Sequence, residues 1–473
     1  MSAIDVVILA AGKGTRMNSS RPKVLHRLAG QPMLGYVLRA AARAGARRCV
    51  VVTGHGAAQV EAYVRDWAKA ESGQPQPELL TALQQPQRGT GHAVQQAAPL
   101  LPDEGITLIL NGDTPLVRPE TLSSLIALCA GGQMALLTVD TGGDAGAYGR
   151  VVRAGAGAGD APVRAIVEAR DASPAELAIT EWYSGVMAAP TALLKRCLAR
   201  LTDDNAQREF YLTDVARHAA AGGATVRALR IQDATQAAGV NSPRELAALE
   251  REMQRRTAER LMACGVRLAD PARLDVRGSL ACGQDVEIDV GCVFAGDVRL
   301  EDGVSVGAYC VIANAHIEAG AVIHPFTHID GGADGVTVGP RARVGPYARL
   351  RPGARLGAEV HIGNFVEVKN STLAEGAKAN HLAYLGDATV GERVNYGAGS
   401  ITANYDGANK HRTVIEAGVH VGSNCVLVAP VTLGEGGAIG AGSVITRDTP
   451  AGALTVARSR QTSAANWRRP GRK

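Results

Sequence analysis

A large apolar residue recurs every six positions through the second half of the sequence, and no other feature constrains the fold as strongly. The series includes Ile288, Phe294, Leu300, Val306, Ile312, Val338, Val344, Leu350, Leu356, Ile362, Val368, Val390, Tyr396, Ile415, Val421, Leu427, Leu433, Ile439 and Ile445. A fixed period of this kind is typical of repeat architectures, in which the chain winds into stacked coils. Three hexads make one triangular coil, with the recurring residues inside and glycines at the tight corners. We therefore expect such coils over residues 266–473.

The first half of the sequence alternates short aliphatic runs with longer segments of helical period. This pattern is typical of βαβ units that build a mostly parallel sheet. Predicted strands cover residues 6–10, 49–53, 79–84 and 106–110, and predicted helices cover residues 33–44, 59–69 and 91–101. The sequence therefore predicts an α/β, Rossmann-like domain over residues 1–238.

A helical linker is expected between the two halves, over residues 239–265. Ser242-Pro243-Arg244-Glu245 supplies an N-cap, a first-turn proline and a capping-box glutamate. The predicted helix runs to about Met262. Its charges alternate in sign at helical spacing, which favours a solvated connector over a nucleic-acid surface.

Composition excludes several classes of protein. The chain has 473 residues and a formal charge of +5, a mild excess that suits phosphate ligands and is too weak to indicate nucleic-acid binding. It has no apolar run near the ~20 residues that a bilayer span needs, and no basic leader of a secretory signal, so we expect a cytoplasmic protein. Its eight cysteines show neither paired nor zinc-ligand spacing, so we expect them reduced.

A glycine-rich loop, Gly12-Lys13-Gly14-Thr15-Arg16-Met17, follows the first predicted strand. Backbone N–H groups in such a loop cradle phosphates, and basic side chains neutralise them. The dinucleotide fingerprint needs a third glycine where Met17 stands, and the P-loop pattern is absent. The longer stretch from Leu9 to Met17, followed by Pro22-Lys23, resembles the signature of sugar-1-phosphate nucleotidyltransferases.

Further residues resemble the uridyltransferase half of the bacterial bifunctional enzymes that make UDP-N-acetylglucosamine. The nucleotide-sugar site implied by this resemblance comprises Leu9, Ala10, Ala11, Gly12, Lys23, Gln84, Gly89, Thr90, Asn111, Gly112, Asp113, Gly149, Glu168, Tyr183 and Asn241. Gln84 and the Gly89-Thr90 segment would read the uracil edge. Arg16 and Lys23 would hold phosphate charge in catalysis, and Asp113 and Asn241 would bind Mg²⁺ through the hard oxygen ligands that it prefers.

Two positions depart from the family pattern. The family commonly has tyrosine before Gly-Asp and asparagine before Ser/Thr-Gly, whereas this chain has Asn111 and Tyr183. The aromatic side chain and the amide are therefore exchanged. If the two positions face each other across the site, the exchange preserves the sugar contacts.

The six-residue period resembles the left-handed parallel β-helix of hexapeptide-repeat acyltransferases. Its phase slips near His381 and breaks at residues 402–413, where Asn380 to Asp387 and Asn404 to Lys410 resemble the acetyltransferase of the same bifunctional enzymes. Imidazole suits a general base near neutral pH, so the resemblance makes His381 the catalytic base. The substrate-binding residues that it implies are Arg351, Lys369, Tyr384 and Asn395, and those for acetyl-CoA are Ala398, Asn404, Tyr405, Ser423, Ala441 and Arg458.

The resemblance as a whole implies two sequential reactions. Glucosamine-1-phosphate is acetylated by acetyl-CoA at the β-helix, and UTP then uridylylates the product with release of pyrophosphate, on the route to peptidoglycan and lipopolysaccharide. A homotrimer and a Mg²⁺ requirement are also implied. One alternative is a single-activity nucleotidyltransferase whose β-helix only oligomerises or binds a regulator. Another is a catalytically inert scaffold, which would not need the Gly12 to Met17 loop and Asp113.

Overall fold

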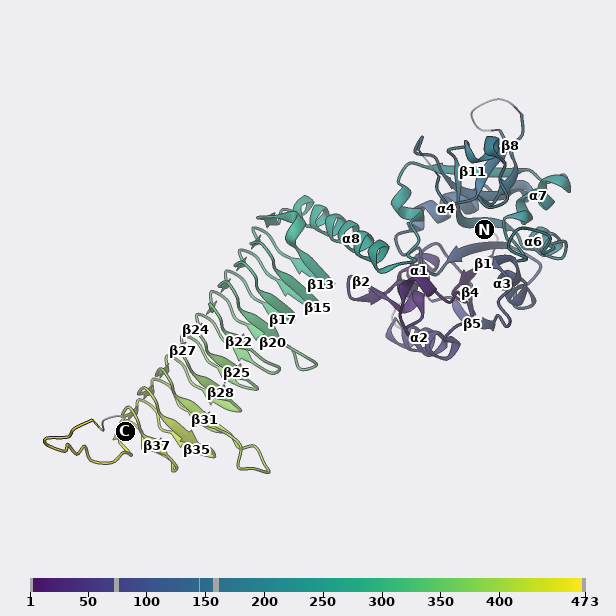
Figure 1. The fold of residues 1–473 in the computed structure, drawn as a ribbon. Coiled ribbons are helices and arrows are strands. Elements are labelled where there is room, and N and C mark those ends of the chain that lie inside the picture. Colours follow the sequence, from purple (N-terminus) through teal and green to yellow (C-terminus); the bar gives the residue numbers. More distant parts are fainter. Residues whose placement is uncertain (1–2, 72–75, 144, 156–160, 470–473) are drawn as a thin grey trace. The chain divides into compact units, whose positions relative to one another are not determined.

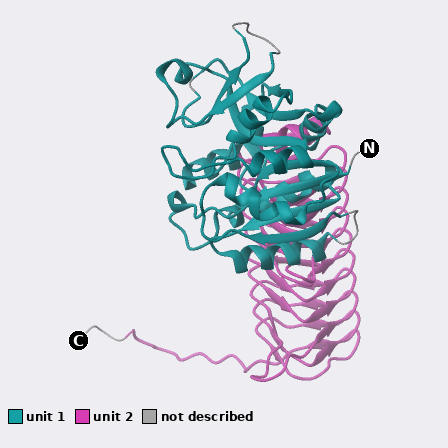
Figure 2. Cartoon of the chain, turned by 90° about the vertical axis from the view of Figure 1, so that its right-hand side faces the viewer, with its two compact units in different colours: residues 1–253 teal, residues 254–473 magenta. Residues whose placement is uncertain are grey.

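The computed structural model describes residues 3–71, 76–143, 145–155 and 161–469. The chain forms two compact units, residues 1–253 and 254–473, drawn as ribbons in Figure 1 and coloured separately in Figure 2. The boundary between them lies within helix α8 (Pro243–Ala263). The domain limits expected at residues 238 and 266 stay a prediction.

A twisted sheet forms the centre of the first unit. Its strand order is β11 (Val226–Ile231), β7 (Met134–Val139), β10 (Trp182–Pro190), β6 (Ile106–Asn111), β1 (Ile4–Leu9), β4 (Arg48–Thr53) and β5 (Glu78–Leu83). Every pair along this path is parallel except those that β10 makes. Helices α1 (Met33–Arg43), α2 (Ala57–Ala70) and α3 (Thr90–Ala97) follow strands in the βαβ manner. The predicted α/β class is confirmed.

The carboxyl ends of β1 and β6 lie side by side. Leu9 pairs with Asn111, and the N–H of Gly112 donates to the carbonyl oxygen of Leu9 at 2.9 Å. Ligands of open α/β sheets bind outside the carboxyl ends of the strands, where the connecting loops diverge. The glycine-rich loop and the Asn111-Gly112-Asp113 segment therefore share one edge of the sheet.

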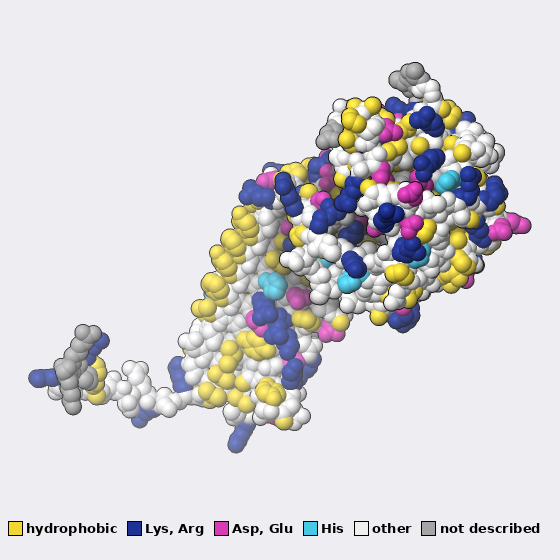
Figure 3. Space-filling model, turned by 45° about the vertical axis from the view of Figure 1, so that its right-hand side comes forward, with side chains coloured by type: hydrophobic (Ala, Val, Ile, Leu, Met, Phe, Trp, Pro, Cys, Tyr) yellow, Lys and Arg dark blue, Asp and Glu magenta, His cyan; other side chains and the backbone are white. Residues whose placement is uncertain are grey.

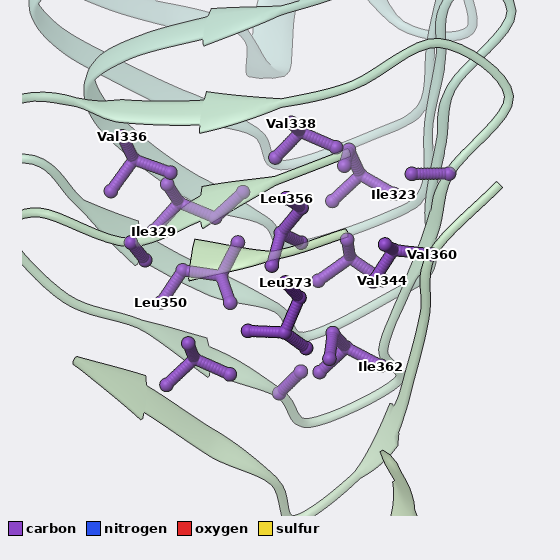
Figure 4. Packing of buried hydrophobic residues seen from close by; sticks show 14 of the residues in the cluster. Ile323, Ile329, Val336, Val338, Val344, Leu350, Leu356, Val360, Ile362 and Leu373 are labelled. Carbon is purple, nitrogen blue, oxygen red and sulfur yellow. The ribbon is translucent and has the colours of Figure 1, made fainter. Parts of the chain in front are cut away.

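The second unit is a parallel β-helix of short strands, from β12 (Arg267–Leu268) to β38 (Leu454–Thr455). Val344 pairs with Ile362 and Leu350 with Val368, so one coil takes three hexads, as predicted. The period-six side chains point into the prism and are almost fully buried, as the cluster in Figure 4 shows. Burial at ~25 cal/mol per Å² of apolar surface makes this column the main stabilising feature of the coils.

The strands that carry predicted site residues lie on two faces of the prism. One face bears β24 (His361–Asn364), β27 (Lys378–His381), β30 (Asn395–Tyr396) and β33 (His420–Val421). The next bears β22 (Arg349–Leu350), β25 (Glu367–Lys369), β28 (Tyr384–Gly386) and β31 (Ile401–Ala403). The third face has no predicted site residue.

The predicted break in the repeat is a hairpin that leaves the coil. Tyr396 pairs with Val421, 25 positions on, whereas Val344 pairs 18 positions on. The extra residues form a loop closed by a bridge between Tyr405 and Lys410 and by the N–H of His411, which donates to the carbonyl oxygen of Asn404 at 2.8 Å. The interruption predicted at residues 402–413 is confirmed.

Helix α8 differs from the solvated connector that its charges predict. Leu249, Ala258 and Leu261 are buried, and the amide of Gln254 forms two hydrogen bonds with the backbone of Val276, at 2.8 and 2.9 Å. Its capping box is also displaced, because the Glu245 carboxylate accepts from the N–H of the residue before Ser242. Alternating charges report the exposed side of a helix and not its buried side.

The sequence predicts neither a membrane-spanning helix nor disulfide bonds. Within residues 3–71, 76–143, 145–155 and 161–469, no helix has the length and apolar character needed to cross a bilayer. All eight cysteines are free thiols, and six of them are buried.

Candidate active sites

A cavity of about 1000 Å³ opens at the carboxyl edge of the first unit's sheet. The predicted residues that line it are Leu9, Ala10, Ala11, Gly12, Lys23, Gln84, Gly89, Thr90, Asn111 and Asp113. They come from the carboxyl ends of β1 and β6 and from the segments after β1, β5 and β6, so the fold brings together positions far apart in the sequence. A cavity of this size accommodates a nucleotide.

Lys23 connects the two predicted metal ligands. Its ammonium donates to Asp113 Oδ2 at 2.5 Å and to Asn241 Oδ1 at 3.0 Å. The two oxygens thus converge on a positive charge in a half-buried setting. One carboxylate and one amide oxygen are the hard ligands that Mg²⁺ takes while keeping several waters, so these residues fit the ion. In the described part of the chain, no cluster of three or more His, Cys, Asp or Glu side chains offers another such position.

Gly14 allows Lys23 to reach this position. Its φ is +58°, in the left-handed region, and a Cβ added there would lie 2.8 Å from Cβ of Lys23. A side chain at residue 14 would therefore suffer backbone strain and push the lysine away. The loop therefore needs glycine at position 14, because a larger residue would displace Lys23.

The Gln84 to Thr90 loop forms the other end of the cavity. Gln84 is buried, and its Nε2 donates to the carbonyl oxygen of Gly89 at 2.9 Å, which leaves the amide oxygen to face a ligand. The Thr90 hydroxyl accepts from the N–H of Leu212 at 3.2 Å and so keeps its own proton to donate. A Cβ on Gly89 would lie 2.7 Å from the carbonyl oxygen of Phe210.

A smaller cavity of about 460 Å³ holds Arg16 and Glu168. Arg16 lines this cavity, whereas Lys23 lines the larger one. Gly149 lies beside Glu168, and its carbonyl oxygen accepts the N–H of Tyr183 at 2.9 Å. The predicted sugar-contacting residues Gly149, Glu168 and Tyr183 thus form one cluster.

Burial shifts the pKa of both titratable members of this cluster in the same direction. Burial raises the pKa of Glu168, although a hydrogen bond from the Thr213 hydroxyl at 3.0 Å opposes the shift. Burial also raises the pKa of Tyr183 well above its usual range, and the charge of Glu168 adds to the effect. The Tyr183 hydroxyl is buried without a hydrogen-bond partner in the described structure.

The exchanged residues Asn111 and Tyr183 lie close to the same segment of β10. A Cβ on Gly185, whose φ is +85°, would lie 2.1 Å from Nδ2 of Asn111. The Asn111 amide therefore packs on the backbone two residues beyond Tyr183. Whether the exchange preserves the sugar contacts stays a prediction.

The predicted set omits several residues that line the larger cavity. The polar ones among them are Lys13, His55, Gln85, Gln87 and Glu209. The Gln87 amide donates to the carbonyl oxygen of Ala11 and so ties the uracil loop to the phosphate loop. Lys13 and Gln87 lie within motifs already identified, and their polar character was an available signal. His55 and Glu209 have no such signal, because only the fold places them there.

In the second unit, His381 is oriented by a neighbouring amide. Its Nδ1 lies 2.8 Å from Oδ1 of Asn364, which pairs with it on the preceding coil. An amide oxygen only accepts, so this contact favours the neutral tautomer in which Nδ1 carries the proton and Nε2 the lone pair. The exposed imidazole is thereby prepared to take a proton.

Arg351 and Lys369 lie on consecutive coils of the adjoining face. The guanidinium of Arg351 is 2.8 Å from Oε1 of Glu367, and that of Arg349 is 3.4 Å from Oε2 of the same carboxylate. Tyr384 pairs with Glu367 on the next coil. These side chains form a basic patch with one aromatic hydroxyl at its edge.

Three predicted acetyl-CoA residues form a column on successive coils. The carbonyl oxygen of Ala398 accepts the N–H of Asn424 at 2.7 Å, and that of Ser423 accepts the N–H of Gly442 at 2.8 Å. The column ends where the guanidinium of Arg458 donates to the carbonyl oxygen of Ala441 at 2.7 Å. Asn404 and Tyr405 stand on the hairpin instead, Asn404 buried and Tyr405 exposed.

A corner of the prism separates the acetyl-site residues into two groups. His381 and Asn395 lie on one face, and Lys369 and Tyr384 lie on the next. The corner carries a stack of half-exposed aromatic rings, Tyr309, Phe326, Tyr347 and Phe365, with centroids 5.0 to 5.5 Å apart. Figure 3 shows hydrophobic side chains in a row along the outside of the β-helix. The two groups of site residues therefore flank this aromatic corner.

Comparison with known proteins covers the whole chain. Residues 6–221 match the MobA-like NTP transferase domain, and residues 412–447 match the bacterial transferase hexapeptide family. The bifunctional protein GlmU of Polaromonas naphthalenivorans is 67% identical, over 99% of this chain and 98% of that protein. The proteins of the same name from Paracidovorax citrulli and Bordetella petrii are 64% and 53% identical, over 100% and 99% of this chain and 99% and 100% of theirs. The chain therefore belongs to the GlmU family of bifunctional proteins.

Proposed function

We propose that the chain catalyses two transfers in sequence. The β-helical unit moves an acetyl group from acetyl-CoA to glucosamine-1-phosphate, and the α/β unit then moves a uridylyl group from UTP to the N-acetylglucosamine-1-phosphate formed. Family membership over 99% of the chain, with a transferase-type domain in each half, is the observation that carries this proposal. The alternative is a single-activity nucleotidyltransferase whose β-helix has no catalytic role. It does not explain the contact between His381 Nδ1 and Asn364 Oδ1.

Acetyl transfer requires a base and an oriented amine. The amine nitrogen attacks the thioester carbonyl carbon, the new C–N bond forms, and the C–S bond breaks to release the thiolate of coenzyme A. His381 Nε2 takes the proton that the amine loses, while Asn364 holds Nδ1. Arg351 and Lys369 would bind the sugar phosphate, with Tyr384 and Asn395 on the sugar, and Arg458 would bind the anionic end of coenzyme A.

Uridylyl transfer needs control of charge more than covalent chemistry. A phosphate oxygen of the sugar phosphate attacks the α-phosphorus of UTP, and the bond to pyrophosphate breaks. Gln84 and Thr90 orient the uracil, and Lys23 neutralises phosphate charge from its place between Asp113 and Asn241. Asp113 and Asn241 would hold Mg²⁺, which when bound draws negative charge from the transferring group. Glu168 and Gly149 would contact the sugar.

The proposal extends to assembly and location. The exposed aromatic corner lies between the faces that carry His381 and Lys369, which supports a homotrimer in which a neighbouring copy covers the corner beside each acetyl site. We place the enzyme in the cytoplasm, where UTP and acetyl-CoA are supplied. We propose domain limits at residues 1–238 and 266–473, with residues 239–265 as the linker.

Two matched variants test the proposal on the same preparations. His381→Ala is expected to lose about 10² to 10⁴-fold in acetyl transfer, the usual share of a general base, with uridylyl transfer intact. Asp113→Asn is expected to lose uridylyl transfer with acetyl transfer intact. Acetyl transfer retained by His381→Ala would favour a single-activity nucleotidyltransferase. Loss of both activities in either variant would indicate misfolding, which circular dichroism would reveal.

A further inference from the structure

Three segments that follow neighbouring strands meet at one backbone carbonyl of the phosphate loop. The strands are β1, β4 and β5, which lie in this order in the sheet (Figure 1). The carbonyl oxygen of Ala11, after β1, accepts from the N–H of His55, after β4, at 3.1 Å. It also accepts from Nε2 of Gln87, after β5. A carbonyl oxygen has two lone pairs, so it serves both donors, and all three residues line the larger cavity.

Gly54 leaves the space that Gln87 needs for this contact. A Cβ added at residue 54 would lie 2.6 Å from Nε2 of Gln87 and 2.8 Å from the carbonyl oxygen of Ala11. A side chain there would therefore displace the glutamine or the loop that it contacts. The Gln87 side chain is half-buried. The hydrogen bond between Gln87 and Ala11 thus belongs to a packed junction and is not a contact of a free surface side chain.

Elsewhere, the uracil loop is attached away from the phosphate loop. The N–H of Gln84 donates to the carbonyl oxygen of Thr53 at 2.8 Å, and the carbonyl oxygen of Arg88 accepts the N–H of Phe210 at 2.9 Å. Neither of these two anchors belongs to the phosphate loop. Gln87 lies between them in the sequence, and its amide reaches the phosphate loop directly. This amide therefore sets the distance between the two loops.

We propose that Gln87 is a positioning residue for uridylyl transfer, which holds the phosphate loop at the distance from the uracil loop that UTP spans. The proposal rests on the proposed function and concerns how recognition of the base reaches the reacting phosphorus. UTP that is held at its base by Gln84 presents its α-phosphorus to the sugar phosphate only if the two loops keep their spacing. A misplacement of about 1 Å costs about a hundredfold in rate, so loss of this hydrogen bond acts on kcat.

Steady-state uridylyl transfer by Gln87→Met tests this role. Methionine keeps an unbranched, uncharged side chain of similar length, but it cannot donate to the Ala11 carbonyl. We expect kcat to fall about tenfold to a hundredfold. Gln95→Met is the matched control, because the Gln95 amide also donates to a backbone carbonyl oxygen, that of Leu198 at 2.8 Å, and neither residue lines the cavity. Its kcat should equal that of the wild type, and an equal kcat in Gln87→Met would overturn the proposal.

A double-mutant cycle with Gln84→Met separates positioning from a loss of stability. If Gln87 transmits base recognition to the phosphates, Gln84→Met should lower kcat in the wild-type background and have little further effect on kcat in Gln87→Met. A loss of stability alone would not produce this coupling. Losses that multiply in the double variant, or a Gln84→Met effect confined to KM, would overturn the proposal.

Equilibrium binding gives a readout that does not depend on turnover. UTP, titrated by calorimetry without sugar phosphate, should bind Gln87→Met about threefold to tenfold more weakly than the wild type, which is the worth of one hydrogen bond. Uridine, which has no phosphate, should bind both chains equally. Equal weakening of both ligands would overturn the proposal, because it would place the damage in the uracil loop alone. Absence of uridylyl transfer in the wild type would instead refute the proposed function, and the two titrations would still show whether Gln87 sets the spacing of the loops.

Discussion

Substitution of Asn364 tests whether the amide orients His381 for proton transfer. The Nδ1···Oδ1 distance of 2.8 Å marks a good hydrogen bond in an exposed setting. Such a bond has a net worth of ~0.5 to 1.5 kcal/mol, and ~1.4 kcal/mol corresponds to a factor of ten. Asn364→Leu should therefore lower kcat of acetyl transfer about twofold to tenfold, well short of the loss expected for His381→Ala. The backbone bond from Leu382 to the carbonyl oxygen of residue 364 remains, so the coil should keep its shape.

Asn364→Asp is the matched control for this series, because it keeps an acceptor at the same position. A carboxylate there would hold the imidazole protonated to higher pH, so the acid limb of the kcat profile should move upward while the plateau activity is retained. Initial rates of acetyl transfer between about pH 6 and 9 measure both effects, with uridylyl transfer as the folding control. Undiminished kcat in Asn364→Leu, or equal losses in both variants, would refute the orienting role.

Three further predictions concern the first unit. Gly14→Ala, which combines a φ of +58° with a Cβ 2.8 Å from that of Lys23, should cost ~1 to 2 kcal/mol of strain and lower uridylyl transfer about tenfold without affecting acetyl transfer. Burial raises the pKa of Glu168, so the contribution of this group to stability is full below its unfolded pKa of ~4.3 and is lost as pH rises through the folded pKa; urea unfolding should show Glu168→Gln gaining on the wild type as the pH rises above ~4.3. Chelation of divalent metal should stop uridylyl transfer alone, and added Mg²⁺ should restore it; continued turnover after chelation would contradict a metal role for Asp113 and Asn241.

The positions of helices and strands were predictable because they depend on local patterns. The strand expected at residues 106–110 is Ile106–Asn111, and the helix expected at residues 33–44 is Met33–Arg43. The six-residue period was equally informative, since each coil repeats the same inward position and Ile312, Val344 and Leu350 are fully buried. The charges of α8 also predicted its exposed side, but they did not predict which of its residues are buried.

The sequence by itself determined which kinds of side chain serve each site, whereas only the tertiary structure decided which of them meet. Arg16 and Lys23 lie in one motif yet line different cavities. Conversely, Asn370, Asp387 and Asn404 are distant in the sequence, yet stacking of the coils lets the Asp387 carboxylate accept hydrogen bonds from both amides. Such contacts depend on loop closure and long-range packing, and neither produces a periodic pattern in the sequence.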